Sequence, residues 1–318
     1  MISFDQNKLK KIAFEAGKVA VLMGGAGAER SISLESGNAV WKALIESGFD
    51  AEPVEWDGRS LAIFDSEKFQ SFFIAVHGSG GEDGSIQAVL EIKGVPYTGS
   101  GILASALGMD KRKAKIIWRD KGLCTPEFVS LKENTPIEVV SQLGFPVVIK
   151  PPCQGSSIGV SLVNGEQDLA QSLKIARTYD SEVMVEKYIA GSEYTVPVLR
   201  NEPLPAVKIE TDREFYDYSA KYKSNSTRYV CPSDLSGSKR REISDLALES
   251  YLALGCEGWG RVDFIQDFEG DFQLIEINTV PGMTSHSLVP MSAKSAGIGF
   301  DQLVVEILAD GLEKRDRR

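Results

Sequence analysis

The chain has 318 residues, of which 42% are hydrophobic and 25% charged, and this ordinary globular composition excludes the disordered and fibrous classes. Its 35 Lys and Arg residues against 45 Asp and Glu residues give a net charge of −10, which disfavours nucleic acid as a partner. The length suggests about two domains, or three smaller lobes around one cleft. The four cysteines form no Cys-x-x-Cys pair and no apolar run is long enough for a membrane span, so we expect a cytoplasmic protein with reduced thiols and no membrane contact.

The first part of the chain alternates between strand and helix patterns. Residues 1–17 are rich in lysine and lack an apolar core, so we expect a short extension that frays before the first strand. The apolar run 19–23 predicts a buried strand, and 33–47 has a helical periodicity. A second strand over 72–76 and a helix over 85–92 follow. This alternation predicts a parallel sheet in an α/β lobe.

After residue 126 strand patterns dominate, with two helices between them over 167–177 and 239–254. The predicted strands are 147–150, 183–188, 194–199, 206–210, 261–266 and 272–278. Residues 211–229 are polar, rich in aromatic residues and without periodicity, and a loop of that length is usually functional or disordered.

A glycine-rich turn after the first strand presents Glu29. The turn invites a dinucleotide-binding reading, but the third glycine of the G-x-G-x-x-G fingerprint is replaced by Arg30, and a P-loop motif is absent as well. What remains is a carboxylate at the carboxyl end of a strand, where α/β folds bind ligands. A solvated glutamate beside a turn explains Glu29 about equally well.

A lysine and a hydroxyl-rich loop indicate a phosphate site. Lys150 ends the apolar strand 147–150, and the loop 155–159 has the sequence Gly-Ser-Ser-Ile-Gly. Backbone N–H groups, two hydroxyls and an ammonium can together cradle phosphate oxygens. The loop alone is more typical of a surface connection, but an ammonium at the end of an apolar strand needs an anionic partner.

The two last strands bear polar groups on strand faces. Alternation puts Arg261 and Asp263 on one face, and it puts Glu276 and Asn278 on a face with Phe272 and Leu274. Two carboxylates and an amide oxygen suit Mg²⁺ held together with nucleotide phosphates. An ion pair between Arg261 and Glu276 is the alternative.

Ser287 stands where a helix begins near Leu288. A helix N-terminus with free N–H groups binds a carboxylate well, and a serine there can also serve only as a cap. These residues alone are compatible with either role.

Taken in chain order, six motifs resemble those of the D-alanine–D-alanine ligases of the ATP-grasp superfamily, and the resemblance runs from about Lys18 to Leu312. Two departures are Gln154, where many members have Glu, and the additional residues 1–17. The motifs are 77–84, 97–101, 155–159, 214–222, 258–263 and 276–288.

The resemblance implies an α/β, three-lobed ATP-grasp fold with ATP held between the sheets of the central and C-terminal lobes. An extension (1–17) would precede an N-terminal parallel-sheet lobe (18–110). A central lobe (111–190) and a C-terminal lobe (191–318) with a mobile lid over 211–229 would follow.

The resemblance also implies an ADP-forming carboxylate–amine ligase. It would join two D-alanines through an acylphosphate for the peptidoglycan precursor, with two Mg²⁺ or Mn²⁺ ions, as a cytoplasmic homodimer. A D-alanine–D-lactate (depsipeptide) ligase or another ATP-grasp ligase is the alternative, and a non-catalytic nucleotide-binding regulator is distinguished by its lack of D-alanine-dependent ADP release.

The residue roles that the resemblance implies fall into four groups. ATP would be bound by Lys111, Lys150, Glu186, Lys187, Ile189, Glu193 and Lys221. The metal ligands would be Asp263, Glu276 and Asn278. Catalysis would use Glu29, Ser156, Tyr222, Arg261 and the N–H of Gly282. Substrate would contact Glu29, His77, Ser287 and Leu288, although a loop-stabilising hydrogen bond explains His77 nearly as well.

Overall fold

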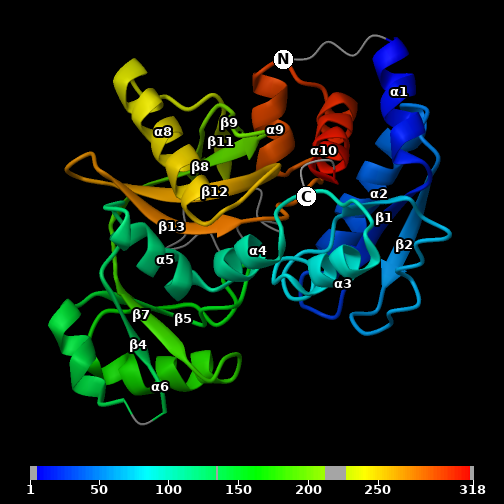
Figure 1. Cartoon of the computed structure of the whole chain (residues 1–318). Coiled ribbons are helices and arrows are strands. Elements are labelled where there is room, and N and C mark those ends of the chain that lie inside the picture. The colour runs from blue at the N-terminus through cyan, green and yellow to red at the C-terminus, as the bar shows by residue number, and fades with distance from the viewer. Residues whose placement is uncertain (1–5, 134, 212–226, 316–318) are drawn as a thin grey trace.

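The computed structural model describes residues 6–133, 135–211 and 227–315, which form three sheets with helices packed around them (Figure 1). The first sheet is parallel, in the order β2-β1-β3, so the predicted parallel α/β lobe is confirmed. Strand β1 is buried throughout because it lies between two strands, which explains its unbroken apolar run. The elements of this part are β1 (Val19–Gly24), α2 (Arg30–Glu46), β2 (Ala51–Trp56), β3 (Ser71–Ile74) and α3 (Ser85–Lys93).

The N-terminal extension is a helix, α1 (Gln6–Ala16), and the prediction of a frayed segment is wrong for these residues. Ile12 and Ala16 lie four residues apart, on one face of the helix, and both are buried in the core of the first sheet. Helix α1 packs against α10 (Phe300–Arg315) at the other end of the chain. The lysines of this segment lie mainly on the outer face of the helix. The lysine-rich composition therefore gave no indication of the narrow apolar stripe on the inner face.

The second sheet is antiparallel, in the order β4-β7-β5-β6, and has its own apolar core. Helix α6 and a short 3₁₀ segment contribute to that core, while α4 and α5 connect the first sheet to this part. Helix α5 begins where the carboxylate of Asp110 accepts hydrogen bonds from the N–H groups of Arg112 and Lys113. The bounds are α4 (Ile102–Met109), α5 (Lys111–Asp120), β4 (Phe128–Leu131), η1 (Ile137–Leu143), β5 (Val147–Lys150), β6 (Ser161–Val163), α6 (Glu166–Arg177) and β7 (Val183–Lys187).

The third sheet is antiparallel, in the order β11-β10-β8-β12-β13, with β9 paired to β8. Helices α5 and α8 pack on the face that carries the core, and the other face is turned toward the second sheet. The bounds are β8 (Gly191–Leu199), β9 (Glu202–Pro203), β10 (Val207–Glu210), β11 (Arg228–Val230), α8 (Gly237–Ala253), β12 (Trp259–Asp267), β13 (Phe272–Asn278) and α9 (Leu288–Ser295).

A β-bulge at Ile275 changes which residues of β13 share a face. Phe264 pairs with Leu274 but Asp263 pairs with Glu276, so Ile275 is the additional residue. Phe272 and Leu274 therefore face the core, whereas Glu276 faces the cavity. The predicted sharing of one face by Glu276, Phe272 and Leu274 is wrong, because strict alternation cannot anticipate an inserted residue.

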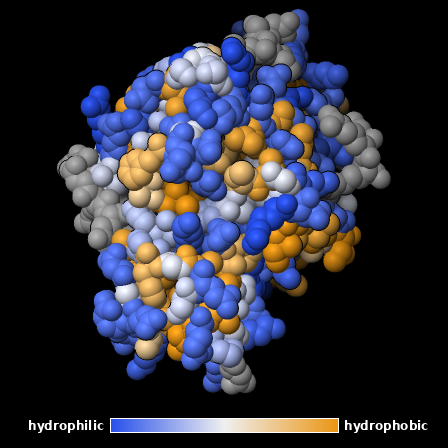
Figure 2. All heavy atoms as spheres, turned by 90° about the vertical axis from the view of Figure 1, so that its left-hand side faces the viewer, coloured by the Kyte–Doolittle hydropathy of each residue, from blue (hydrophilic) through white to orange (hydrophobic). Residues whose placement is uncertain are grey.

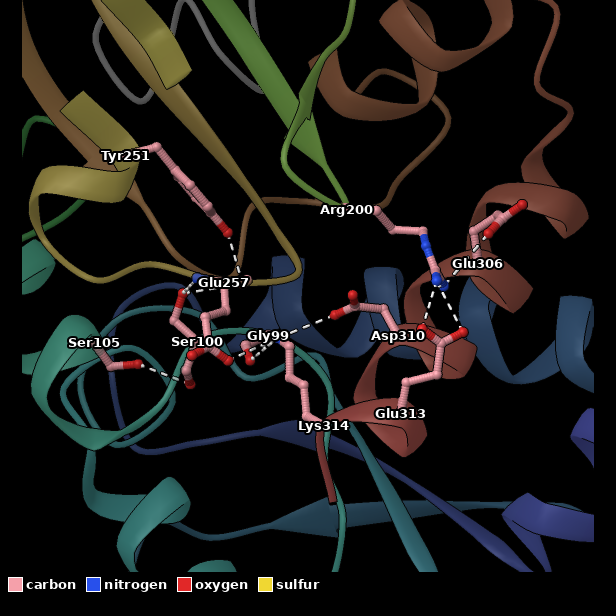
Figure 3. A network of polar contacts seen from close by, with 10 residues as sticks. All are labelled: Gly99, Ser100, Ser105, Arg200, Tyr251, Glu257, Glu306, Asp310, Glu313 and Lys314. Atoms are coloured by element: carbon pink, nitrogen blue, oxygen red, sulfur yellow. Dashed lines mark hydrogen bonds and ion pairs between the residues drawn. The ribbon is translucent and has the colours of Figure 1, made fainter. Parts of the chain in front are cut away.

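Helix α10 returns to the first sheet, where its apolar side chains join the core that contains β1 and β3. A polar network fixes its end (Figure 3). Lys314 donates to the carbonyl of Gly99 at 2.9 Å and pairs with Asp310 at 3.1 Å, while Arg200 holds Glu313 at 2.6 Å. The last helix thus ties together segments from distant parts of the chain, and the predicted domain boundaries stay a prediction.

None of the helices in the described ranges combines the length and apolar character that a membrane span requires. On the face seen in Figure 2, apolar residues form separate groups among hydrophilic ones.

Candidate functional site

A cavity of about 650 Å³ lies between the second and third sheets. Strands β5 and β7 contribute one wall, and β8, β10, β12 and β13 contribute the other. Six of the predicted ATP-binding residues line it, and the seventh, Lys221, lies outside the described residues. The six are Lys111, Lys150, Glu186, Lys187, Ile189 and Glu193.

A buried cluster of two lysines and one glutamate stands at one end of this cavity. Glu186 forms ion pairs with Lys150 and with Lys115, the latter at 3.2 Å. Burial alone would raise the pKa of Glu186, but the two ammonium groups outweigh burial and hold its pKa below the usual value. Burial lowers the pKa of Lys115 to about 8. Sequence reasoning missed Lys115, although it lies on the buried face of α5 with Ala114 and Trp118, where a lysine is a visible exception.

Lys111 lies between the third sheet and the start of the hydroxyl-rich loop 155–159, which was predicted to bind phosphate. Its ammonium donates to the carbonyl oxygen of Gln154 at 2.7 Å and pairs with Glu276 at 3.2 Å. Because Gln154 uses its backbone oxygen, the departure from the family's glutamate at this position leaves this contact intact.

The polar ends of β12 and β13 meet around Asp263. Arg261 donates two hydrogen bonds to this carboxylate, at 2.8 and 2.7 Å, and Asn278 donates a third at 3.1 Å. The hydroxyl of Thr195 adds a fourth at 2.5 Å. Arg261 thus forms an ion pair with Asp263 on the same strand, while Glu276 pairs with Lys111.

Asp263, Glu276 and Asn278 fit a magnesium-type site by their chemistry. Asp263 and Glu276 are opposite each other on neighbouring strands, and the side-chain N–H of Asn278 donates to Asp263, so two carboxylates and one amide group lie in one part of the sheet. Within the described ranges no three His, Cys, Asp or Glu side chains converge as a metal would require. The predicted metal-ligand set has only two carboxylates, and its third ligand is the amide oxygen of Asn278.

A second, smaller cavity of about 60 Å³ adjoins the first. Neighbouring residues of the same loop and the same strand line the two cavities: Gln154 and Glu276 line the larger, Gly155 and Asn278 the smaller. The smaller cavity brings together the predicted catalytic and substrate-binding residues, apart from Tyr222, which lies outside the described residues together with the rest of 212–226. These residues are Glu29, His77, Ser156, Arg261, Gly282, Ser287 and Leu288. Of the predicted lid over 211–229, Arg228 and Tyr229 belong to strand β11, which pairs with β10, so the prediction of a loop is wrong for these two residues.

Glu29 and Ser156 are in direct contact, as predicted. The Ser156 hydroxyl donates to Glu29 Oε1 at 2.5 Å, across 127 positions of sequence. A Cβ at either Gly78 or Gly155 would lie 2.7 Å from Glu29 Oε2, so both glycines are needed to leave room for the carboxylate. Ser156 and Ser157 have φ of 51° and 57°, a strained conformation that non-glycine residues adopt mainly at functional sites.

His77 contacts protein groups on both ring nitrogens. Nδ1 lies 2.7 Å from the carbonyl oxygen of Val280 and Nε2 lies 3.0 Å from the hydroxyl of Ser36. Burial lowers the pKa of His77, so the ring is neutral, with Nδ1–H donating to Val280 and Nε2 accepting from Ser36. These contacts favour the loop-stabilising role for His77.

Glu82 was not predicted and lines the same cavity. Its Oε1 accepts a hydrogen bond from the N–H of Val280 at 3.2 Å. Burial, reinforced by the nearby Glu29 carboxylate, raises the pKa of Glu82 well above its usual value. The sequence feature that could have indicated a role for Glu82 is its position in the glycine-rich loop after β3, five residues beyond His77.

Ser287 occupies the N-cap position of α9 but its side chain makes no capping hydrogen bond. Its hydroxyl accepts instead from the N–H of Thr284 at 2.9 Å. Of the two roles left open for Ser287, the side-chain cap is not formed, because the hydroxyl is bonded within the preceding turn.

Two family models match the chain. The model described as the D-ala D-ala ligase C-terminus covers residues 117–309, and that of the D-ala D-ala ligase N-terminus covers residues 59–100.

Individual relatives span nearly the whole chain. A D-alanine--D-alanine ligase of Pseudomonas entomophila (strain L48) is 49% identical over 300 residues, 94% of each chain. The crystal structure of a D-alanine--D-alanine ligase from Bacillus anthracis complexed with ATP matches with a TM-score of 0.85 at 32% identity, covering 95% of this chain and 99% of that one. VanG D-Ala:D-Ser ligase from Enterococcus faecalis matches with a TM-score of 0.82 at 30% identity, covering 93% and 99%.

Proposed function

The chain belongs to the D-alanine–D-alanine ligase family and has its ATP-grasp fold, and from this membership we propose that it joins two D-alanine molecules into D-alanyl-D-alanine. It is an ADP-forming ligase, and the dipeptide serves peptidoglycan synthesis.

One observation carries this proposal: a nucleotide-sized cavity adjoins a small polar cavity, and one loop and one strand line both. A ligase that activates a carboxylate with ATP needs the nucleotide and the amino acid side by side. The paired Glu29 and Ser156 then offer a carboxylate for a substrate ammonium, close to Arg261, which suits a carboxylate or an oxyanion.

The first step makes the carboxylate reactive, because hydroxide is a poor leaving group. An oxygen of the first D-alanine carboxylate attacks the γ-phosphorus of ATP, the bond to the β-phosphate oxygen breaks, and ADP leaves. Lys111 and Lys150, both buried against the cavity, neutralise charge on the phosphate oxygens during transfer.

A divalent metal ion bound at Asp263, Glu276 and Asn278 supplies further positive charge to the phosphate oxygens when present. The residues themselves hold the geometry: Arg261 and Thr195 orient Asp263, and Lys111 orients Glu276.

In the second step the amine of the second D-alanine attacks the acyl carbon and phosphate leaves. A tetrahedral oxyanion forms, and Arg261 and the N–H of Gly282, which line the same cavity, are the donors that we assign to it. One such donor commonly contributes about 3 kcal/mol to the transition state. Ser287 and Leu288 lie beside them and are proposed to hold the second carboxylate.

The test is ADP release coupled to product analysis, with ATP, magnesium and D-alanine, D-lactate or L-alanine. We expect ADP release that depends on D-alanine, with dipeptide as the product identified by mass spectrometry. ADP release that is independent of D-alanine would indicate a different activity, and absence of any nucleotide turnover would favour a binding protein.

The second substrate is the alternative that the comparisons raise, because a D-Ala:D-Ser ligase is among the similar structures. Competition between D-alanine, D-serine and D-lactate in one mixture distinguishes the three products by mass. Two metal ions, a homodimer and a cytoplasmic location stay predictions.

A further inference from the structure

The loop after β13 bears the N–H group that we assign to the oxyanion, and it is held in an unusual way. Its residues are Val280, Pro281, Gly282 and Met283. The N–H groups of Val280 and Met283 both donate to side chains, Pro281 has no N–H, and Gly282 N–H donates to no described residue. The single uncommitted N–H of this loop is thus the proposed oxyanion donor.

The groups that hold the loop all come from the first sheet and its neighbours. Glu82 accepts from Val280 N–H at 3.2 Å, and His77 Nδ1–H donates to the carbonyl oxygen of Val280 at 2.7 Å. Ser36 on α2 accepts from Met283 N–H at 3.0 Å and donates to His77 Nε2 at 3.0 Å. The three bonds to the loop join residues that are 198 to 247 positions apart in the sequence.

We propose that Ser36, His77 and Glu82 are positioning residues that hold the Val280–Met283 loop so that Gly282 N–H points at the tetrahedral oxyanion. This inference rests on the proposed function. Both backbone groups of Val280 and the N–H of Met283 are bonded, so the peptide between them has little freedom. Ser287 adds a further limit, because a Cβ at Gly282 would lie 2.8 Å from its hydroxyl oxygen.

The arrangement holds together the two groups that we assign to the first D-alanine. The elements that hold the loop also carry Glu29, which begins α2, and Gly78, which leaves room for its carboxylate. Glu29, proposed to bind the ammonium of the first substrate, and Gly282 N–H, proposed to bind the oxyanion, are therefore held in place by the same elements. Displacement of a catalytic group by about 1 Å can lower the rate about 100-fold.

The decisive measurement compares the two chemical steps in Glu82→Ala. We expect dipeptide formation to fall about 10- to 100-fold, while the first transfer falls by no more than about threefold. The first transfer, from ATP to the D-alanine carboxylate, is measured separately. An oxygen isotope placed at the bridging position of ATP should exchange with the non-bridging positions when D-alanine is present. Glu82→Gln should restore most of the lost rate, because its amide oxygen can accept from Val280 N–H.

Ser79→Ala is the matched control, because this exposed side chain belongs to the same loop and contacts Asp83 rather than the Val280–Met283 loop. Ser36→Ala is the second test should Glu82→Ala fail to fold, and it should show the same selective loss in the second step. Equal losses in both steps, or no loss in either, would overturn the proposal. Wild-type protein that makes no dipeptide would instead contradict the proposed function.

Discussion

Glu276 faces the larger cavity only because of the bulge beside it, and it is the carboxylate best placed to serve both Lys111 and a metal ion. We expect Glu276→Gln to lower kcat more than tenfold, a loss of at least about 1.4 kcal/mol, with the fold retained. Steady-state ADP release measures the loss, and circular dichroism checks the fold. Asp271→Asn, the same change at an exposed position just before β13, is the control. A variant that keeps more than a tenth of the rate refutes the metal-ligand role.

Glu186 is expected to make the free energy of unfolding fall at acidic pH. Its pKa lies below the ordinary value of 4.5 in the folded protein, so its contribution to stability is complete above pH 4.5 and is lost as the pH falls through the folded-state pKa. We expect the free energy of unfolding to fall more steeply below pH 4.5 in wild type than in Glu186→Gln. At neutral pH the variant should be less stable by about 3 kcal/mol, because two buried ammonium groups lose their counter-ion.

Urea unfolding on both sides of pH 4.5 tests this prediction, with the exposed Glu269→Gln as the matched control. Parallel pH profiles for wild type and Glu186→Gln would mean that Glu186 is not the titrating group.

At the scale of single elements, helix α1 shows how two buried residues can anchor a mostly charged segment. Ile12 is 6% exposed and packs into the core with α10, whereas Phe14 on the same helix is 88% exposed. We expect Ile12→Ala to lower the free energy of unfolding by about 2 kcal/mol and Phe14→Ala to change it by less than about 0.5 kcal/mol. Urea unfolding of the three proteins gives both values. Similar values for the two variants would mean that α1 is not docked.

At the scale of the whole molecule, Ser100 joins segments 157 positions apart (Figure 3). Its hydroxyl accepts from the N–H of Glu257 at 3.1 Å, and Tyr251 donates to the carbonyl oxygen of the same residue at 2.6 Å. Ser100→Ala leaves the Glu257 N–H without this acceptor, so we expect a loss of stability of about 1–3 kcal/mol. Ser105→Ala, which removes one longer bond of 3.4 Å, should cost less. The reverse order in urea unfolding would contradict this reading of the network.

The features that could be predicted from the sequence are local or are carried by motifs. The bounds of β5 and β13 agree with the predicted strands, because a run of apolar or alternating residues marks the extent of a strand. The predicted site residues that the structure describes line one or the other of the two cavities or, like Asp263, lie beside them, and Glu29 contacts Ser156 as predicted. Arg30, which replaces the third glycine of the dinucleotide fingerprint, donates to the carbonyl oxygens of Gly25 and Trp56.

Contacts that depend on packing between distant segments could not be predicted from the sequence and became visible in the folded structure. The bulge at Ile275, the docking of α1 and the burial of Lys115 each follow from neighbours that no local pattern contains. The same holds for Ser36 and Glu82, which are an ordinary helix serine and loop glutamate until the fold brings Val280 and Met283 against them. Side-chain periodicity specifies which face of an element is buried, but hydrogen-bond partners are specified by the atoms that another element places within about 3 Å.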